Sequence, residues 1–152
     1  MKKLLLVALA ALTLTTACKK NDDSTPTPAV STTMQVSSSL TGAQEIPAVT
    51  TSATGAMTGT YDTSTRVLTY AVTYAGLSSA PTGGHLHLGG PTVASGPVSI
   101  AFTNVATSPI TGTVTLSTTQ ADALLASGGG MYVNLHTTAN GNGEIRGNVV
   151  VK

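Results

Sequence analysis

Short runs in which apolar and polar residues alternate recur along this chain from about residue 32 to its end, and turn-forming residues separate them. Alternation with a period of two is the pattern of a β-strand with one buried face. Strands at such regular spacing are typical of a β-sandwich or barrel. Thr, Val, Ser and Gly, which favour strands and turns, dominate these runs. The sequence therefore predicts an all-β domain, an antiparallel sandwich or barrel of about eight strands, near residues 32–40, 54–61, 66–75, 84–89, 97–103, 110–116, 131–137 and 144–151.

One segment, residues 118–127 (TTQADALLAS), departs from this pattern. It combines a Thr that can cap a helix, a run of good helix formers, and Gly128 just after it as a stop. We expect one short helix over about residues 119–127, lying across one end of the sandwich.

The first 30 residues have a different composition and predict export. Lys2 and Lys3 precede an apolar run at residues 4–14, which is too short for a membrane-spanning helix of about 20 residues and fits a signal peptide. Residues 15–18 (TTAC) resemble the cleavage box of bacterial lipoproteins, in which the cysteine becomes the lipid-modified N-terminus. The alternative is a plain signal peptide with a cysteine there by chance. We expect a lipoprotein signal peptide at 1–17, a lipidated Cys18 with a flexible tether over 18–30, and a domain over 31–152.

Lipidation at Cys18 would make the membrane a partner and place the protein in the cell envelope. Asp22 and Asp23, shortly after the cysteine, resemble export tags that carry some lipoproteins to the outer face of the outer membrane. We expect an outer-membrane location, with periplasmic or surface orientation left open. Cys18 is the only cysteine, so an exported chain of this kind forms no internal disulfide.

Composition also excludes several function classes. Seven basic and six acidic side chains form no basic patch, so nucleic acid is not an expected partner. The aspartates fall in the tether, a hairpin turn and the helix, which leaves no Ser-His-Asp arrangement to argue. The two glutamates are not placed as a pair for glycoside hydrolysis. One Phe and no Trp argue against an aromatic sugar-binding platform.

All three histidines stand at strand positions where their side chains can converge. His85 and His87 are two residues apart in GHLHLG, so both project from one face of a strand while the leucines between and after them point to the other. In residues 131–137 (MYVNLHT) the same alternation puts His136 on the polar face. Three neutral imidazoles form a ligand set suited to one Cu or Zn ion. The alternative is a set of hydrogen-bonded or solvent-facing sheet residues.

Five further polar residues are candidates for the surroundings of this site. Glu45, in a turn, would bond turn amides, pair with Arg146, or accept a proton from a ligand imidazole and so fix its tautomer. Gln44 and Asn134 are candidates for the same role. Glu144 and Arg146 alternate on one face of the last strand, where a structural ion pair is the default. A partly buried Arg146 near the histidines would instead draw an anion toward a bound metal.

Five sequence blocks occur in a defined order: residues 40–47 (LTGAQEIP), 84–89 (GHLHLG), 96–98 (GPV), 132–137 (YVNLHT) and 143–147 (GEIRG). Together they resemble the CHRD domain, first named from chordin and common in exported bacterial proteins, over about residues 38–150. Ala48 stands where the family pattern often has a second proline. The resemblance implies an immunoglobulin-like, Greek-key β-sandwich or barrel and gives no established activity.

A second resemblance is local. The stretch from Tyr70 through a Gly-Leu turn to the His-x-His strand is similar to the copper-binding strand of Cu/Zn superoxide dismutases. His136, a Gly- and Asn-rich loop and Arg146 are similar to that family's later copper ligand and active-site arginine. The bridging histidine, the zinc loop and the cysteine pair are missing. The resemblance therefore implies a superoxide-dismutase-like fold with a copper-like corner and without the zinc site.

Three functional hypotheses follow. The first is a lipid-anchored envelope binding module with a three-histidine Cu or Zn site and an unknown protein partner. The second is a redox enzyme of superoxide dismutase type. The third is a structural or adhesive envelope domain without metal, in which the histidines form a hydrogen-bond network. We favour the binding module over the enzyme.

Overall fold

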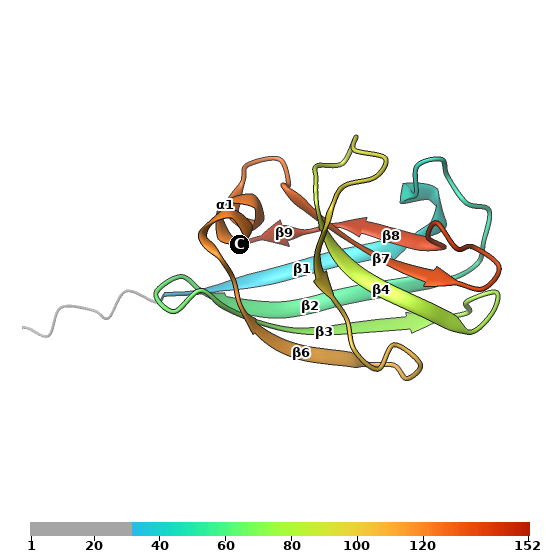
Figure 1. The fold of residues 1–152 in the computed structure, drawn as a ribbon, viewed down its shortest axis with the longest axis horizontal. Coiled ribbons are helices and arrows are strands. Elements are labelled where there is room, and N and C mark those ends of the chain that lie inside the picture. Colours follow the sequence, from blue (N-terminus) through green and yellow to red (C-terminus); the bar gives the residue numbers. More distant parts are fainter. Residues whose placement is uncertain (1–31) are drawn as a thin grey trace, which may run out of the picture.

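Nine strands, one α-helix and one short 3-10 helix make up residues 32–152, the part of the chain that the computed structural model describes. The strands pair antiparallel in one sheet that curls around a core (Figure 1). In chain order the elements are β1 (Thr33–Thr41), η1 (Gly42–Gln44), β2 (Thr54–Asp62), β3 (Val67–Ala75), β4 (Pro81–Leu88), β5 (Val98–Ala101), β6 (Ile110–Thr115), α1 (Thr118–Leu125), β7 (Met131–Thr137), β8 (Ile145–Asn148) and β9 (Val150–Val151). The expectations for the signal peptide, Cys18 and the tether fall outside the described residues and stay predictions.

The order of strands across the sheet is β5-β4-β7-β8-β1-β2-β3-β6, and β9 also pairs with β1. The chain crosses between the two halves of the sheet, β5-β4-β7-β8 and β1-β2-β3-β6, after β3, after β5 and after β6. The curl brings the halves face to face: the ring of Tyr70 on β3 lies 5.1 Å from that of Phe102, just after β5. The prediction of an all-β, antiparallel sandwich or barrel is confirmed.

One face of each strand supplies the core, as the alternation predicts. On β7 the inward residues Met131, Val133 and Leu135 are buried in it. On β4, Leu86 points inward, while Gly84 leaves room for the side chains of Leu135 and Phe102, which a Cβ there would crowd. The fully buried side chains of the other strands include Leu40, Met57, Leu68, Val72 and Ile145.

The short helix is present one residue earlier than its expected start. Ser117, not Thr118, is the N-cap: its hydroxyl accepts from the N–H of Gln120, and the Gln120 side chain accepts from the N–H of Ser117. This reciprocal capping box satisfies two backbone donors at the helix start. Ala121 and Leu124 face the core. Within residues 32–152 no helix has the length and apolar character needed to cross a membrane.

Three strand boundaries differ from the expected ones. β4 begins at Pro81 rather than residue 84, because its glycines already pair with β7. The strand expected over 97–103 keeps only Val98–Ala101 as β5. The last expected strand divides into β8 and β9 at Val149, which turns its buried side chain inward and bonds to Met131.

Candidate metal centre

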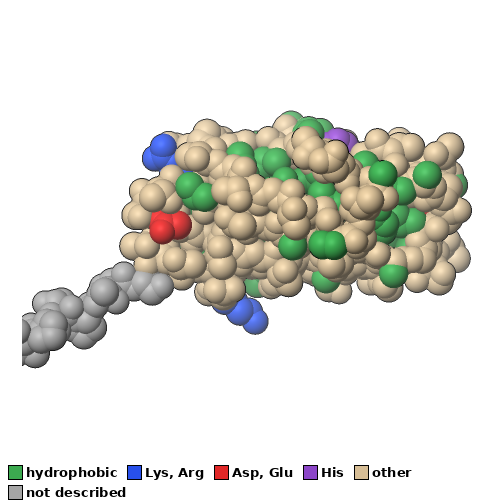
Figure 2. Space-filling model, turned by 90° about the horizontal axis from the view of Figure 1, so that it is seen from below, with side chains coloured by type: hydrophobic (Ala, Val, Ile, Leu, Met, Phe, Trp, Pro, Cys, Tyr) green, Lys and Arg blue, Asp and Glu red, His purple; other side chains and the backbone are tan. Residues whose placement is uncertain are grey.

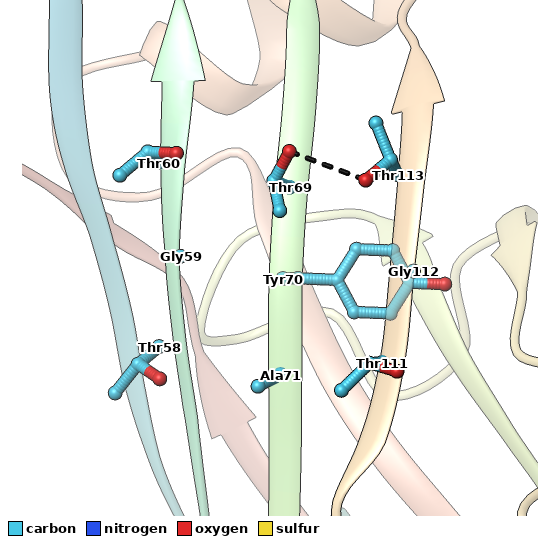
Figure 3. A pocket seen from close by; sticks show the side chains of 9 residues that line it. All are labelled: Thr58, Gly59, Thr60, Thr69, Tyr70, Ala71, Thr111, Gly112 and Thr113. Atoms are coloured by element: carbon cyan, nitrogen blue, oxygen red, sulfur yellow. Dashed lines mark hydrogen bonds between the residues drawn. The ribbon is translucent and has the colours of Figure 1, made fainter.

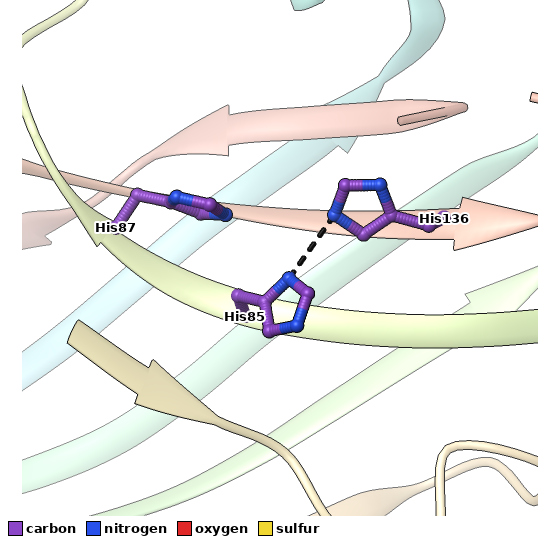
Figure 4. A group of neighbouring side chains, drawn as sticks. All are labelled: His85, His87 and His136. Carbon is purple, nitrogen blue, oxygen red and sulfur yellow. Dashed lines mark hydrogen bonds between the residues drawn. The ribbon is translucent and has the colours of Figure 1, made fainter. Parts of the chain in front are cut away.

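The three histidines lie together on the outer face of β4 and β7. The antiparallel register places His85 opposite Asn134 and His87 opposite Tyr132, with His136 two residues further along β7. Residues directly opposite or diagonal on one face are within side-chain reach. One potential ligand nitrogen from each of the three imidazoles lies within 4.8 Å of the other two (Figure 4). The predicted convergence of the three side chains is confirmed.

Backbone carbonyls hold two of the rings in a defined tautomer. The Nδ1 of His87 lies 2.8 Å from the carbonyl oxygen of Gly96, and the Nδ1 of His136 lies 3.0 Å from that of Gly141. Because a carbonyl oxygen only accepts, both Nδ1 atoms carry protons, and Nε2 offers the lone pair in the neutral ring. The Nε2 of His136 is 3.1 Å from the Nδ1 of His85. Carbonyl partners of this kind are typical of imidazoles that ligate metals.

The surroundings favour neutral imidazoles. Burial lowers the pKa of His85, and possible positive charges on His136 and His87 lower it further. Burial also lowers the pKa of His136, more than its bond to Gly141 raises it. Since a ligating imidazole must be unprotonated, these shifts favour the metal-binding form of His85 and His136 at neutral pH.

Tyr132 and Arg146 form a stack with His87. The Tyr132 and His87 rings lie parallel, 4.7 Å apart, and the guanidinium carbon of Arg146 is 3.5 Å from the centre of the Tyr132 ring. One ring face cannot carry both groups at these distances, so Tyr132 lies between the imidazole and the cation. Arg146, which is 1% exposed, also donates to the carbonyls of Gly90 and Ala94 in the β4–β5 loop.

Asn134 and Glu45 extend the polar layer beyond the rings. The Oδ1 of Asn134, which can only accept, is 3.1 Å from the Nε2 of His87. For Nε2 to keep its lone pair, the amide must instead present its NH₂ to the ring, and for ligation it must rotate away from the side on which a metal would bind. Glu45 is 7% exposed, and burial raises its pKa to about 7 against the opposing charge of Arg146. Gly143, with φ +126°, leaves space for this carboxyl, since a Cβ there would overlap the Glu45 Oε1.

Gln44 points away from the histidines. Its amide donates to the carbonyl oxygen of Ser39 and the hydroxyl of Thr41, both on β1. The sequence grouped Gln44 with Asn134, but the structure brings only Asn134 to an imidazole.

The prediction of an ion pair between Glu144 and Arg146 is wrong, because the two side chains bond to different partners. The Glu144 carboxylate accepts from the Thr51 hydroxyl, from the Ser78 N–H and hydroxyl, and from the Thr137 hydroxyl, at 2.7–2.8 Å. Burial alone would raise the pKa of Glu144, but these bonds outweigh it and lower the pKa to about 2. Glu144 therefore ties three loops together, while Arg146 turns to Tyr132.

A cleft of about 410 Å³ adjoins the cluster. His87, His136, Tyr132 and Asn134 line it on one side, and the remaining walls come from Ile46, Pro47, Ala94, Ser95, Gly141 and Asn142. A larger hollow of about 460 Å³ lies over β2, β3 and β6, in the other half of the sheet (Figure 3). It is lined mainly by threonines and contains no cluster of metal ligands.

Sequence reasoning missed Tyr132 and the two carbonyls. Tyr132 shares the face of His136, so the alternation alone could have suggested it. Nothing local in the sequence indicates that the loops return the Gly96 and Gly141 carbonyls to the rings.

The model of the CHRD domain family matches residues 36–149. No curated protein and no solved structure matches the chain.

Proposed function

Because the chain belongs to the CHRD-domain family, we propose that it is a binding module that holds one Cu or Zn ion between His85, His87 and His136. The observation that supports this most is the convergence of the three imidazoles, with ligand nitrogens within 4.8 Å of one another. Four-coordinate Zn needs ligand nitrogens at about 2.0–2.1 Å from the ion. Because the nitrogens of a tetrahedral site lie closer together than 4.8 Å, the rings would rotate toward one another on binding and the Asn134 amide would rotate away from His87.

The donor set also fits the chemistry of these ions. Imidazole nitrogen is a good ligand for both Zn and Cu, whereas Mg and Ca prefer oxygen. Three protein ligands leave one position open in a tetrahedral site. The cleft lined by His87 and His136 lies beside that position, so an external ligand would have access. A bound ion would supply a Lewis acid at the floor of this cleft.

Elemental analysis tests the proposal. The purified full chain is incubated with Zn or Cu, freed of excess metal and analysed; we expect about one ion per chain, as a three-histidine site predicts. His136→Ala and His85→Ala should each abolish tight binding while leaving the circular dichroism spectrum unchanged, because neither ring packs in the core. Gln44→Ala is the matched control, since its side chain points to β1. Substoichiometric metal in the wild type, or unchanged binding in both histidine variants, would contradict the proposal.

We place this module at the cell envelope, anchored through a lipid on Cys18. The support is the sequence of residues 1–18, with its basic start, short apolar run and cysteine.

A redox activity of superoxide dismutase type is the second candidate, favoured by one observation. The cleft would give a small molecule access to a Cu ion on His87 and His136. A dismutase assay on the copper-loaded full chain, with His136→Ala as control, separates the two functions. Tight copper binding without activity supports the binding module alone.

A further inference from the structure

The two edges of the sheet are protected differently. β5 lies at one edge, where the Gln120 side chain on α1 donates to the carbonyl and hydroxyl oxygens of Ser99. The pairing of β5 with β4 also contains a register irregularity at His87. Side-chain cover and bulges are common ways of blocking an edge strand. β6 lies at the other edge and, among residues 32–152, nothing bonds to its outer side.

The register with β3 identifies which backbone groups of β6 are free. Leu116 donates its N–H to the carbonyl of Arg66, which makes this a bonded pair. In an antiparallel ladder bonded pairs alternate along the strand. The bonds between β6 and β3 therefore fall at residues 110, 112 and 114, and the N–H and C=O groups of Thr111, Thr113 and Thr115 point away from the sheet.

The strand and its neighbouring surface also lack the usual deterrents to pairing. β6 contains no charged residue and no proline, and its pairing with β3 has no bulge. The adjoining outer face of β2 and β3 carries threonines and alanine around a shallow hollow (Figure 3). Seen from this side, the Lys, Arg, Asp and Glu side chains gather toward one end of the molecule (Figure 2). Arg66, which is exposed and donates to the carbonyl of Leu116, lies just beyond the end of β6; along Thr111–Thr115 no charged side chain opposes the approach of another strand.

We propose that the free edge of β6 pairs antiparallel with β6 of a second copy of this chain, so that one sheet continues across a two-fold axis. With the axis at Thr113, this residue exchanges backbone hydrogen bonds with its symmetry mate, and Thr111 faces Thr115 of the partner. The exposed threonines then align on one face as cross-strand pairs, an arrangement that β-branched residues favour. The inward residues Ile110, Gly112 and Val114 of the two copies then lie side by side on the opposite face of the continued sheet.

A second copy fits this edge better than an open series of strands does. A two-fold contact uses the same surface on both partners, so the uncharged strand meets an uncharged strand. Once two β6 edges pair, the remaining edge of each copy is the blocked β5. Assembly therefore closes at two. The contact is short, which places the dimer among weak, concentration-dependent interfaces.

Sedimentation of the purified full chain over a range of concentrations, in detergent micelles kept in excess, tests the proposal. We expect a reversible monomer–dimer equilibrium. Thr113→Pro removes the central N–H donor, which faces solvent in the monomer, a position where an edge strand tolerates proline. It should weaken dimerisation by at least about tenfold, a loss of about 1.4 kcal/mol. Thr113→Val is the matched control: it loses the hydroxyl contact with Thr69 but keeps the N–H, and should dimerise normally.

A charge variant tests the same contact independently, so the proposal stays testable even if Thr113→Pro does not fold. Thr113→Lys brings two like charges together at the axis and should give monomers, whereas Thr58→Lys, on the same face but on the inner strand β2, should not. Amide exchange at Thr111, Thr113 and Thr115 should slow as the wild-type concentration rises. A chain that stays monomeric throughout would overturn the proposal and leave the edge to a strand of another protein. A dimer insensitive to both Thr113→Pro and Thr113→Lys would overturn it as well.

Discussion

Replacing Glu144 by Gln probes the buried carboxylate that ties the loops around the histidine face. The carboxylate accepts four hydrogen bonds, from Thr51, from two groups of Ser78, and from Thr137. A hydrogen bond to a charged group contributes about 1.5–3 kcal/mol, and one between neutral groups about 0.5–1.5 kcal/mol. Glutamine has nearly the same shape, and the hydroxyls can rotate to accept from its NH₂. The loss is therefore the charge assistance, about 1–1.5 kcal/mol per bond. Because the four donors share a single charge, their contributions are less than additive, and we expect about 2–4 kcal/mol in total.

Urea unfolding followed by circular dichroism at pH 7 measures this loss in the full chain, and the melting temperature should fall by about 10 °C. The pKa of Glu144 is about 2 in the folded chain and 4.5 ordinarily, so the folded state binds fewer protons between these values. The stability that the carboxylate contributes is therefore present above pH 4.5 and is lost as pH falls toward 2. The difference in free energy of unfolding between wild type and Glu144→Gln should therefore disappear as the pH falls from 4.5 to 2. A gap at pH 7 below about 0.5 kcal/mol, the usual range of surface substitutions, would refute the reasoning.

Glu45→Gln is the matched control, since it makes the same change in the opposite environment. Burial raises the pKa of Glu45 to about 7, so the folded chain holds this proton more tightly than the unfolded chain does. Wild-type stability should therefore decline as pH rises from 4.5 through 7, because the buried carboxyl must ionise. Glutamine mimics the protonated form. At pH 8 the variant should be more stable than wild type by about 1–3 kcal/mol.

The remaining predictions concern metal binding, the aromatic stack and the anchor. Because the pKa values of His85 and His136 are lowered, Zn binding followed by titration should persist below pH 6.5 and weaken only at more acidic pH; loss already at pH 7 would contradict this. In urea unfolding, Tyr132→Phe should lower the free energy of unfolding by about 1 kcal/mol, because it removes only the hydroxyl that accepts from the N–H of Gly96. Tyr132→Leu should lower it by about 3 kcal/mol, because it also removes the ring that covers the buried Arg146. Equal losses in the two variants would argue against the stack. Cys18→Ser should move the protein from the membrane fraction to the soluble fraction on immunoblots, and retention in the membrane would disprove lipid anchoring.

The sequence predicted those features that depend on alternation along a single strand. His85 and His87 share a face because strand geometry has a period of two, and the same rule assigns His136 and the buried Leu135 to opposite faces. Alternation does not say which strands pair, and the pairing of β4 with β7 comes from the structure. Given that pairing, convergence of the imidazoles follows.

The features that the sequence did not predict depend on loops and on the exact register. Glu144 and Arg146 alternate on one strand and have opposite charges, so a local reading pairs them. In the structure they lie in separate networks, because Ser78 and Thr137 surround the carboxylate and Tyr132 presents its ring to the guanidinium. Each of these partners comes from a distant part of the chain. No local pattern distinguishes that arrangement from an ion pair.

The outer faces of the two halves of the sheet explain why a site forms on one half only. Both carry polar residues, but those of β2, β3 and β6 are mostly threonines open to solvent. Over β4, β7 and β8 the loops 89–97, 45–49 and 139–143 fold back and cover the polar layer, so that Asn134 and Arg146 are buried although they point away from the core. Burial makes each polar group there require a partner. The same burial lowers the pKa of His85 and His136. The covering loops thus convert an ordinary polar face into a partly buried cluster of imidazoles, in which His85 and His136 favour the neutral form that metal ligation requires.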